Sequence, residues 1–153
     1  MKNYHYGSEE WFENKFSNLE HKGDGWGHNL YSSQKYRMGS CLEILAEFIS
    51  EDNLNILDVG CAACDFTNLV YSLNKNNNIF ASDISKNAVT HNSSKYKEFE
   101  HSVQRLPKLD FKDSNFDTII ALEVINYLNL EEREEAMQSV KSKLKSGGHF
   151  LEK

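Results

Sequence analysis

The sequence predicts an α/β fold: a doubly wound, mostly parallel sheet with helices on both faces. Two observations favour it. Short apolar runs alternate along the chain with stretches in which apolar residues recur at helical spacing. One run, residues 56–59, leads through Gly60 and four small residues into a helical stretch. This order predicts a buried strand, a tight turn and a helix start, the unit from which such sheets are built.

The first third of the chain is expected to hold two helices and a loop. Residues 8–16 form a short helical stretch. Residues 20–29 are rich in glycine and histidine, and this composition disfavours regular structure. Residues 34–50 form the second helix, because their apolar side chains recur at the spacing of one helix face. These side chains are Met38, Cys41, Leu42, Leu45, Phe48 and Ile49.

Strands and helices then alternate. Residues 55–60 form the first strand, and residues 65–73 form a helix that packs on it. Residues 78–83 are the second strand. Ser85 follows at once, and its hydroxyl is suited to cap a helix that runs to about residue 93.

The second half is expected to add three strands. Residues 98–103 form a short third strand, and the apolar residues 116–122 form the fourth. Residues 130–144 form a helix with acidic residues early and basic residues late, as the helix dipole favours. The glycines at 147–148 end this helix, and a fifth strand begins at His149.

The composition limits the classes of function. A chain of 153 residues with 39% hydrophobic and 26% charged residues is typical of one globular domain. Its net charge of −6 disfavours a nucleic-acid partner, because phosphate binding needs an excess of Lys and Arg. No apolar run reaches the roughly 20 residues of a membrane-spanning helix. Three cysteines do not form a disulfide framework, so we expect a cytoplasmic protein without a membrane partner.

The loop at residues 60–64 and Asp83 form the predicted ligand site. Small side chains let the loop backbone approach a ligand, and the N–H groups at the following helix start face a polar or anionic group. Asp83 closes the second strand about 20 positions after Gly60, where a carboxylate accepts hydrogen bonds from both hydroxyls of a ribose. The alternatives are an ordinary strand–helix turn and an aspartate that only caps the next helix.

The order of several motifs over residues 26–153 resembles class I S-adenosylmethionine-dependent methyltransferases, with a Rossmann-like core. The motifs are Asp58-Val59-Gly60-x-Ala62-x-Cys64, Ser82-Asp83, Leu106-Pro107, residues 116–128 and residues 144–148. Within this family, residues 60–63 and an upstream segment with Trp26 and Tyr31 most resemble the nodulation protein S type, which N-methylates an amino sugar. The resemblance implies S-adenosylmethionine as cofactor, S-adenosylhomocysteine as product, and a small amine or amino sugar as substrate.

The resemblance also implies roles for individual residues. The turn would pass under the methionine part of the cofactor, Asp83 would hold the ribose, and Ile84 would lie against the adenine. The expected catalytic residues are Glu123, His28 and Tyr127, and no metal is expected. The expected cofactor contacts are Trp26, Tyr31, Lys35, Tyr36, Asp58, Gly60, Cys61, Ala62, Cys64, Phe66, Asp83, Ile84, Ser102, Val103, Gln104, Glu123 and Val124.

Two departures from the family pattern bear on cofactor binding. Cys64 stands where the family has glycine, so a positive φ there would be strained. Ser102 stands where the family has an acidic contact to the adenine. Residues 61–64 also form a Cys-x-x-Cys at a helix start, which leaves a thiol-redox protein as an alternative with a lowered pKa at Cys61. A cofactor-binding module without activity of its own is the other alternative.

We expect one domain over residues 1–153, with residues 1–33 as a lid or substrate segment and residues 34–153 as the core. Family members continue past the fifth strand. The sheet is therefore expected to be truncated after strand five, with an apolar edge at Phe150 and Leu151. A homodimer or a partner chain is expected at that edge, and the aromatic segment 11–16 is expected to fold back over the sheet or the site.

Overall fold

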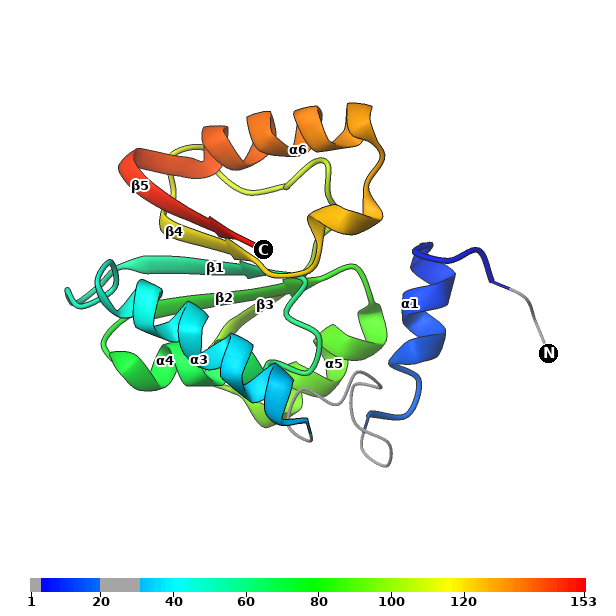
Figure 1. Cartoon of the computed structure of the whole chain (residues 1–153), viewed down its shortest axis with the longest axis horizontal. Helices are drawn as coiled ribbons and strands as arrows, with labels where there is room; N and C mark the ends of the chain where they lie inside the picture. The colour runs from blue at the N-terminus through cyan, green and yellow to red at the C-terminus, as the bar shows by residue number, and fades with distance from the viewer. Residues whose placement is uncertain (1–3, 20–30) are drawn as a thin grey trace.

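The computed structural model describes residues 4–19 and 31–153. In this part of the chain a five-stranded parallel sheet has the order β3-β2-β1-β4-β5. The strands are β1 (Asn55–Val59), β2 (Asn78–Asp83), β3 (Glu100–Val103), β4 (Phe116–Ala121) and β5 (Leu144–Glu152). The helices are α1 (Glu9–Lys15), α3 (Ser32–Ala46), α4 (Asp65–Leu73), α5 (Lys86–Lys95), the 3₁₀ helix η1 (Ile125–Tyr127) and α6 (Leu130–Lys143). The predicted doubly wound α/β fold is confirmed, because α6 covers one face of the sheet and α3, α4 and α5 the other (Figure 1).

The direction of winding places the ligand end of the sheet. From the central strand β1 the chain moves outward through β2 and β3, and it then crosses to β4 and β5 on the other side. This reversal between β1 and β4 is the topological switch point, where parallel sheets open a crevice at the carboxyl ends of their strands. The loop after β1 starts at this point.

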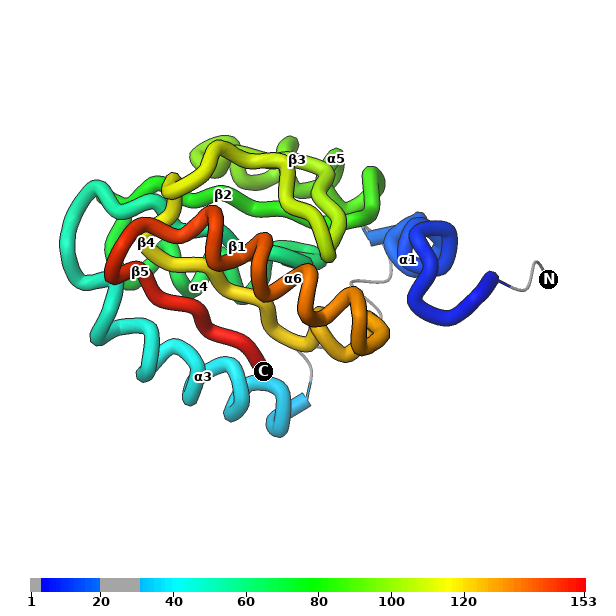
Figure 2. The backbone as a smooth tube through the Cα atoms, turned by 90° about the horizontal axis from the view of Figure 1, so that it is seen from above, coloured from blue at the N-terminus to red at the C-terminus, as the bar shows by residue number. Residues whose placement is uncertain are grey.

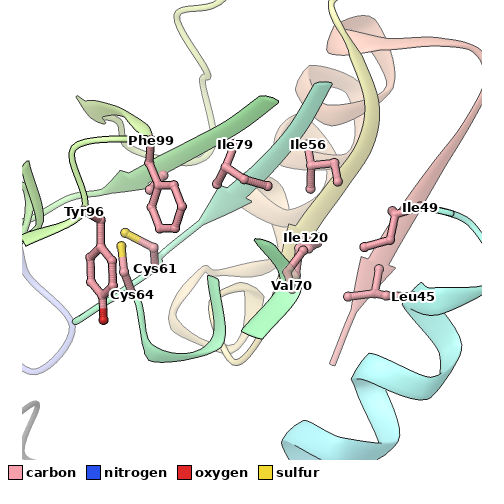
Figure 3. Close-up of a cluster of buried hydrophobic side chains, with 11 residues drawn as sticks. Leu45, Ile49, Ile56, Cys61, Cys64, Val70, Ile79, Tyr96, Phe99 and Ile120 are labelled. Carbon is pink, nitrogen blue, oxygen red and sulfur yellow. The ribbon is translucent and has the colours of Figure 1, made fainter. Parts of the chain in front are cut away.

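Buried apolar side chains hold the two central strands between the helix layers. Leu57 of β1 and Ile119 of β4 are fully buried on the α6 side. Phe116 packs edge-on against Phe80 and Phe111, with ring centroids 5.1 Å apart in each pair. A second cluster lies under the opposite face, where Figure 3 shows side chains from α3, α4 and the sheet in contact. The two clusters make the sheet a rigid base for the loops at its carboxyl end.

The last helix and strand differ from their predicted bounds. Helix α6 ends at Lys143, and β5 already begins at Leu144 instead of His149. Gly147 lies inside the strand with φ of +79°, and the pairing register with β4 shifts between Phe116 and Thr118. The prediction that the glycines at 147–148 end the helix is therefore wrong, because they belong to an irregularity within the strand.

Helix α1 lies beyond the carboxyl ends of the strands (Figure 1). Phe16, which follows it, is 3% exposed and packs with Leu19 against Ala63 and Ala88. These contacts confirm that the segment 11–16 folds back over the site end of the sheet.

Strand β5 forms one outer edge of the sheet, and α3 runs alongside it (Figure 2). Its His149 ring stacks on Phe48, with centroids 4.2 Å apart. Phe150 and Leu151 are half-buried, each packed against one of the two core clusters. None of the helices in the described residues is long and apolar enough to cross a membrane.

Candidate functional site

A cavity of about 320 Å³ opens at the carboxyl ends of β1, β2 and β4. This volume lies at the lower end of the range of small-molecule sites. Its floor is the loop after β1, and its sides are the ends of β2 and β4 together with α3 and α1. The cavity therefore occupies the switch point at which the sequence places a ligand.

The loop needs glycine at its first position. Gly60 has φ of +75°, and a Cβ on it would lie 2.4 Å from Cγ2 of Val124. Ala62 and Cys64 also adopt positive φ, 49° and 59°. Cys64 thus occupies the left-handed region in which glycine would be unstrained, and its side chain is completely buried. The loop keeps its close approach to the cavity at the cost of backbone strain.

The Asp83 carboxylate ties the loop to the end of β2. Its Oδ2 accepts a hydrogen bond from the N–H of Ala62 at 3.0 Å, and its Oδ1 accepts one from the N–H of Ser85 at 2.9 Å. Burial raises the pKa of Asp83 to about 6, with a smaller contribution from the charge of Glu13, while the two amide hydrogen bonds oppose the shift. Each oxygen retains a lone pair that is suited to a hydroxyl donor.

Asp58, at the end of β1, is a second buried carboxyl group of the cavity wall. Burial raises its pKa to about 7, the charge of Asp83 adds to the shift, and the hydrogen bond from Thr67 opposes it. Oγ1 of Thr67 donates to Oδ2 of Asp58 at 2.6 Å. The site therefore holds two carboxyl groups that titrate near neutral pH.

An ion pair joins opposite walls of the cavity. Arg37 of α3 donates to the carboxylate of Glu123, which follows β4. The same guanidinium also donates to the side-chain oxygen of Gln34. Glu123 has φ of +58°, a conformation that is strained in a residue with a side chain. The predicted catalytic glutamate is thus in the cavity, and an arginine that the sequence analysis did not single out holds it.

Aromatic rings close the side of the cavity next to α1. Tyr127 of η1 lies 5.1 Å from the ring of Phe12 and 5.5 Å from the ring of Tyr6. Burial raises the pKa of Tyr127 to about 12, and its hydrogen bond with Tyr6 and the charge of Glu123 add to the shift. This direction disfavours Tyr127 as a proton acceptor at neutral pH and favours a role in shaping the wall.

Glu13 fixes α1 to the start of α5. Its carboxylate accepts hydrogen bonds from the hydroxyl of Ser85 and from the backbone N–H groups of Lys86 and Asn87. The side chain of Asn87 donates in return to the backbone oxygen of Glu13. A carboxylate at the N-terminus of a helix is favoured by unpaired amides and by the helix dipole. The α1 wall of the cavity is therefore held by a charged contact as well as by ring packing.

Replacing Glu13 with alanine is expected to loosen this wall. The loss of three hydrogen bonds to a charged acceptor should lower the free energy of unfolding by about 1–2 kcal/mol. The amide protons of Lys86 and Asn87 should then exchange faster with solvent. Asn14→Ala, at an exposed position of the same helix, is the matched control. Equal exchange in the two variants would show that Glu13 does not hold α1.

Many of the predicted cofactor contacts, and the predicted catalytic residues Glu123 and Tyr127, meet at this cavity. The residues in its wall are Asp58, Gly60, Cys61, Ala62, Phe66, Asp83, Ile84, Gln104, Glu123, Val124 and Tyr127. Other predicted residues are not brought to it: Tyr31, Lys35, Tyr36, Cys64, Ser102 and Val103 do not line the cavity. Tyr36 is 80% exposed on α3. Trp26 and His28 lie outside the described residues.

Helix α3 presents to the cavity a face other than the one that carries Lys35 and Tyr36. The lining residues on this helix are Gln34, Arg37, Met38 and Cys41. They follow the spacing of three and four positions that defines one helix face. Met38 and Cys41 are core positions that the helical spacing predicts, but that spacing does not single out Arg37. The lining residues Phe12 and Phe16 belong to the aromatic segment that was expected to fold back over the sheet or the site, whereas Gly7 comes from a tertiary contact that no local pattern indicates.

The two cysteines of the loop do not have the environment of a redox pair. The hydrogen bond with Cys64 and burial together raise the pKa of the Cys61 thiol well above its usual range. Figure 3 shows both side chains in the buried cluster beside Tyr96 and Phe99. The expected lowering of the Cys61 pKa is wrong, because the hydrogen bond with Cys64 and burial both favour the neutral thiol. The redox alternative loses the feature on which it rested.

Solved structures share this fold at low sequence identity. The N-methyltransferase NodS from Bradyrhizobium japonicum WM9, in complex with S-adenosyl-L-homocysteine, has a TM-score of 0.74 and 20% identity, over 92% of this chain and 71% of that one. The PH0226 protein from Pyrococcus horikoshii OT3 has a TM-score of 0.70 and 21% identity, over 80% of this chain and 58% of that one. A chain of the complex between the Haloferax volcanii Trm112 methyltransferase activator and a methyltransferase has a TM-score of 0.71 and 18% identity, over 89% of this chain and 58% of that one. The chain therefore spans less than two thirds of the length of two of these neighbours.

No curated protein sequence matches the chain significantly. A family model described as a methyltransferase domain matches residues 57–150, which is more than half of the chain. This match confirms, at the level of the family, the predicted methyltransferase domain. At 20% identity, the likeness to NodS shows the fold alone. The chain belongs to the methyltransferase domain family.

Proposed function

We propose that this chain binds S-adenosylmethionine in the cavity and transfers its methyl group to a small amine, such as an amino sugar. One observation carries the proposal: the left-handed loop at Gly60 and the buried carboxylate of Asp83 face the same cavity at the switch point. The small side chains of the loop and the lone pairs of Asp83 fit a ligand with a ribose and a thin chain. When bound, the cofactor supplies an electrophilic methyl group on a sulfonium.

The walls suggest how the chain would orient this cofactor. Asp83 would accept hydrogen bonds from the ribose hydroxyls, and Ile84 would lie against the adenine. Arg37 is a cation of the wall and would pair with the carboxylate of the methionine part. In doing so it would leave Glu123, its present partner. Methyl transfer depends mainly on such positioning and on exclusion of water.

The acidic and aromatic side of the cavity favours an amine as methyl acceptor. Glu123 and Glu132 line it together with the rings of Phe12 and Tyr127. Carboxylates and ring faces both attract a protonated amine. The amine must lose its proton before it attacks, and Glu123, once released by Arg37, would accept that proton.

Calorimetric titration with S-adenosylmethionine and S-adenosylhomocysteine tests the cofactor step. A second assay follows the methyl group from labelled cofactor to a panel of amines, hydroxyls and carboxylates. Transfer to amines supports the whole proposal, while transfer only to oxygen contradicts the choice of acceptor. Binding without transfer to any acceptor would identify a cofactor-binding module. The absence of binding at millimolar cofactor would remove the proposal altogether.

We also propose that a second copy of the chain pairs at the edge formed by β5. This strand is outermost on its side of the sheet. The exposed side chains near it are Ile44 on α3, Phe48 just after α3 and Met137 on α6. An apolar strand edge is normally covered, because its N–H and C=O groups template pairing with another chain. Sedimentation at micromolar concentration should show a dimer, and a monomer that is fully folded would contradict this proposal.

A further inference from the structure

Two residues of the loop are held in a conformation that their side chains disfavour. Ala62 and Cys64 have φ of 49° and 59°, where the Cβ of an L-residue crowds the backbone. Such positions persist only when the surrounding structure over-determines them. The contacts of the Ala62 peptide groups therefore decide whether the loop keeps its shape.

Asn92 of α5 makes one of the contacts to the Ala62 peptide groups. Its side-chain Nδ2 donates to the backbone oxygen of Ala62 at 2.7 Å and also contacts Sγ of Cys61 at 3.7 Å. On the other side, the N–H of Ala62 donates to Asp83. Ala62 is thus held through both its N–H and its C=O group.

The cost of this arrangement indicates that it is not mere packing. Asn92 is completely buried, and its side-chain oxygen Oδ1 has no hydrogen-bond partner in the part of the chain that the structure describes. An unpaired buried acceptor is unfavourable, and an apolar side chain would fill the same space without it. The presence of an amide here is therefore best explained by its donor Nδ2, which holds the Ala62 carbonyl.

We infer that Asn92 is a positioning residue for cofactor binding. It holds the loop in its left-handed shape although alanine and cysteine occupy positions where glycine would be unstrained. This inference rests on the proposed function for its link to the cofactor. Asn92 does not line the cavity. It acts through Ala62, whose C=O group it holds and whose N–H group donates a hydrogen bond to Asp83.

The test compares Asn92→Ala and Asn92→Leu with the wild-type chain. Both variants lose the donor, and leucine keeps a side chain branched at Cγ. Each should raise the Kd for S-adenosylhomocysteine about tenfold or more, since a strained loop without its anchor relaxes away from the cavity. In turnover, the KM for the cofactor should rise while kcat changes less. Asn78→Ala removes an exposed asparagine at the start of β2, away from the cavity, and should leave the Kd unchanged.

A rescue variant separates loop geometry from general stability. Ala62→Gly removes the strain at the position that Asn92 holds, so Asn92→Ala combined with Ala62→Gly should recover most of the lost affinity. Folded Asn92 variants with wild-type affinity, or a double variant as weak as Asn92→Ala, would overturn the inference. If the wild-type chain does not bind the cofactor, the proposed function fails. Amide exchange at Ala62 then still tests the anchor: faster exchange in Asn92→Leu supports it, and unchanged exchange refutes it.

Discussion

Gly60→Ala is expected to destabilise the protein and to abolish cofactor binding. The new Cβ would lie 2.4 Å from Cγ2 of Val124, in a residue whose φ is +75°. Strain and overpacking together should lower the free energy of unfolding by about 2–4 kcal/mol. Because relief of the clash requires the loop or the segment after β4 to move, the cavity should also lose its shape. Urea unfolding measures the first effect, and titration with S-adenosylhomocysteine measures the second.

A matched glycine and a paired substitution sharpen this test. Gly39 lies within α3, and a Cβ built on it meets nothing within 4 Å. Gly39→Ala should therefore stabilise the chain by about 0.5–1 kcal/mol. Val124→Ala in the Gly60→Ala background removes the clash but leaves the strained φ, so it should recover part of the stability. If Gly60→Ala behaves like Gly39→Ala, the loop is not shaped as the structure shows.

The sheet could be predicted because its signals are local. The strand at residues 78–83 and the helix at residues 65–73 have the bounds that the sequence indicates. Each is a continuous apolar or helical run that ends at a turn or capping residue, and Ser85 does cap α5 by accepting from the N–H of Ala88. The loop after β1 was found for the same reason, since strand, small residues and helix follow each other in the chain.

The rest of the site could not be predicted because it depends on side-chain direction and tertiary contacts. The family resemblance indicates Lys35 and Tyr36, but α3 turns them away from the cavity and presents Gln34 and Arg37. Ser102 lies on the short edge strand β3, and the cavity is reached by Gln104, Arg105 and Leu106 beyond it. The pairing of Arg37 with Glu123 joins segments far apart in sequence. No spacing rule indicates such a pair.

Asp83→Ala is expected to weaken cofactor binding by about 1.5–3 kcal/mol, because it removes hydrogen bonds to a charged acceptor. Part of this loss would come from the ribose and part from the loop, whose Ala62 N–H loses its partner. Asp83→Asn separates the two, since an amide oxygen still accepts one hydrogen bond but carries no charge. Asp110→Asn, at an exposed aspartate, is the control for the loss of one charge. Equal affinity in Asp83→Ala and Asp110→Asn would contradict the assigned role.

The pH dependence of stability and of binding should run in opposite directions. The folded protein raises the pKa of Asp83 to about 6 and that of Asp58 to about 7, from 3.8 for an unperturbed aspartate. Between the unfolded pKa and the raised folded pKa of each group, the folded state binds more protons than the unfolded state. The contribution of both groups to stability therefore falls as pH rises from about 4 to 7. Asp58→Asn should flatten that fall, measured by urea unfolding at several pH values.

Ribose hydroxyls, in contrast, donate to the ionised form of Asp83, so cofactor affinity should weaken as pH falls below about 6. Affinity that is constant across this range would show that Asp83 does not contact the ribose as a carboxylate.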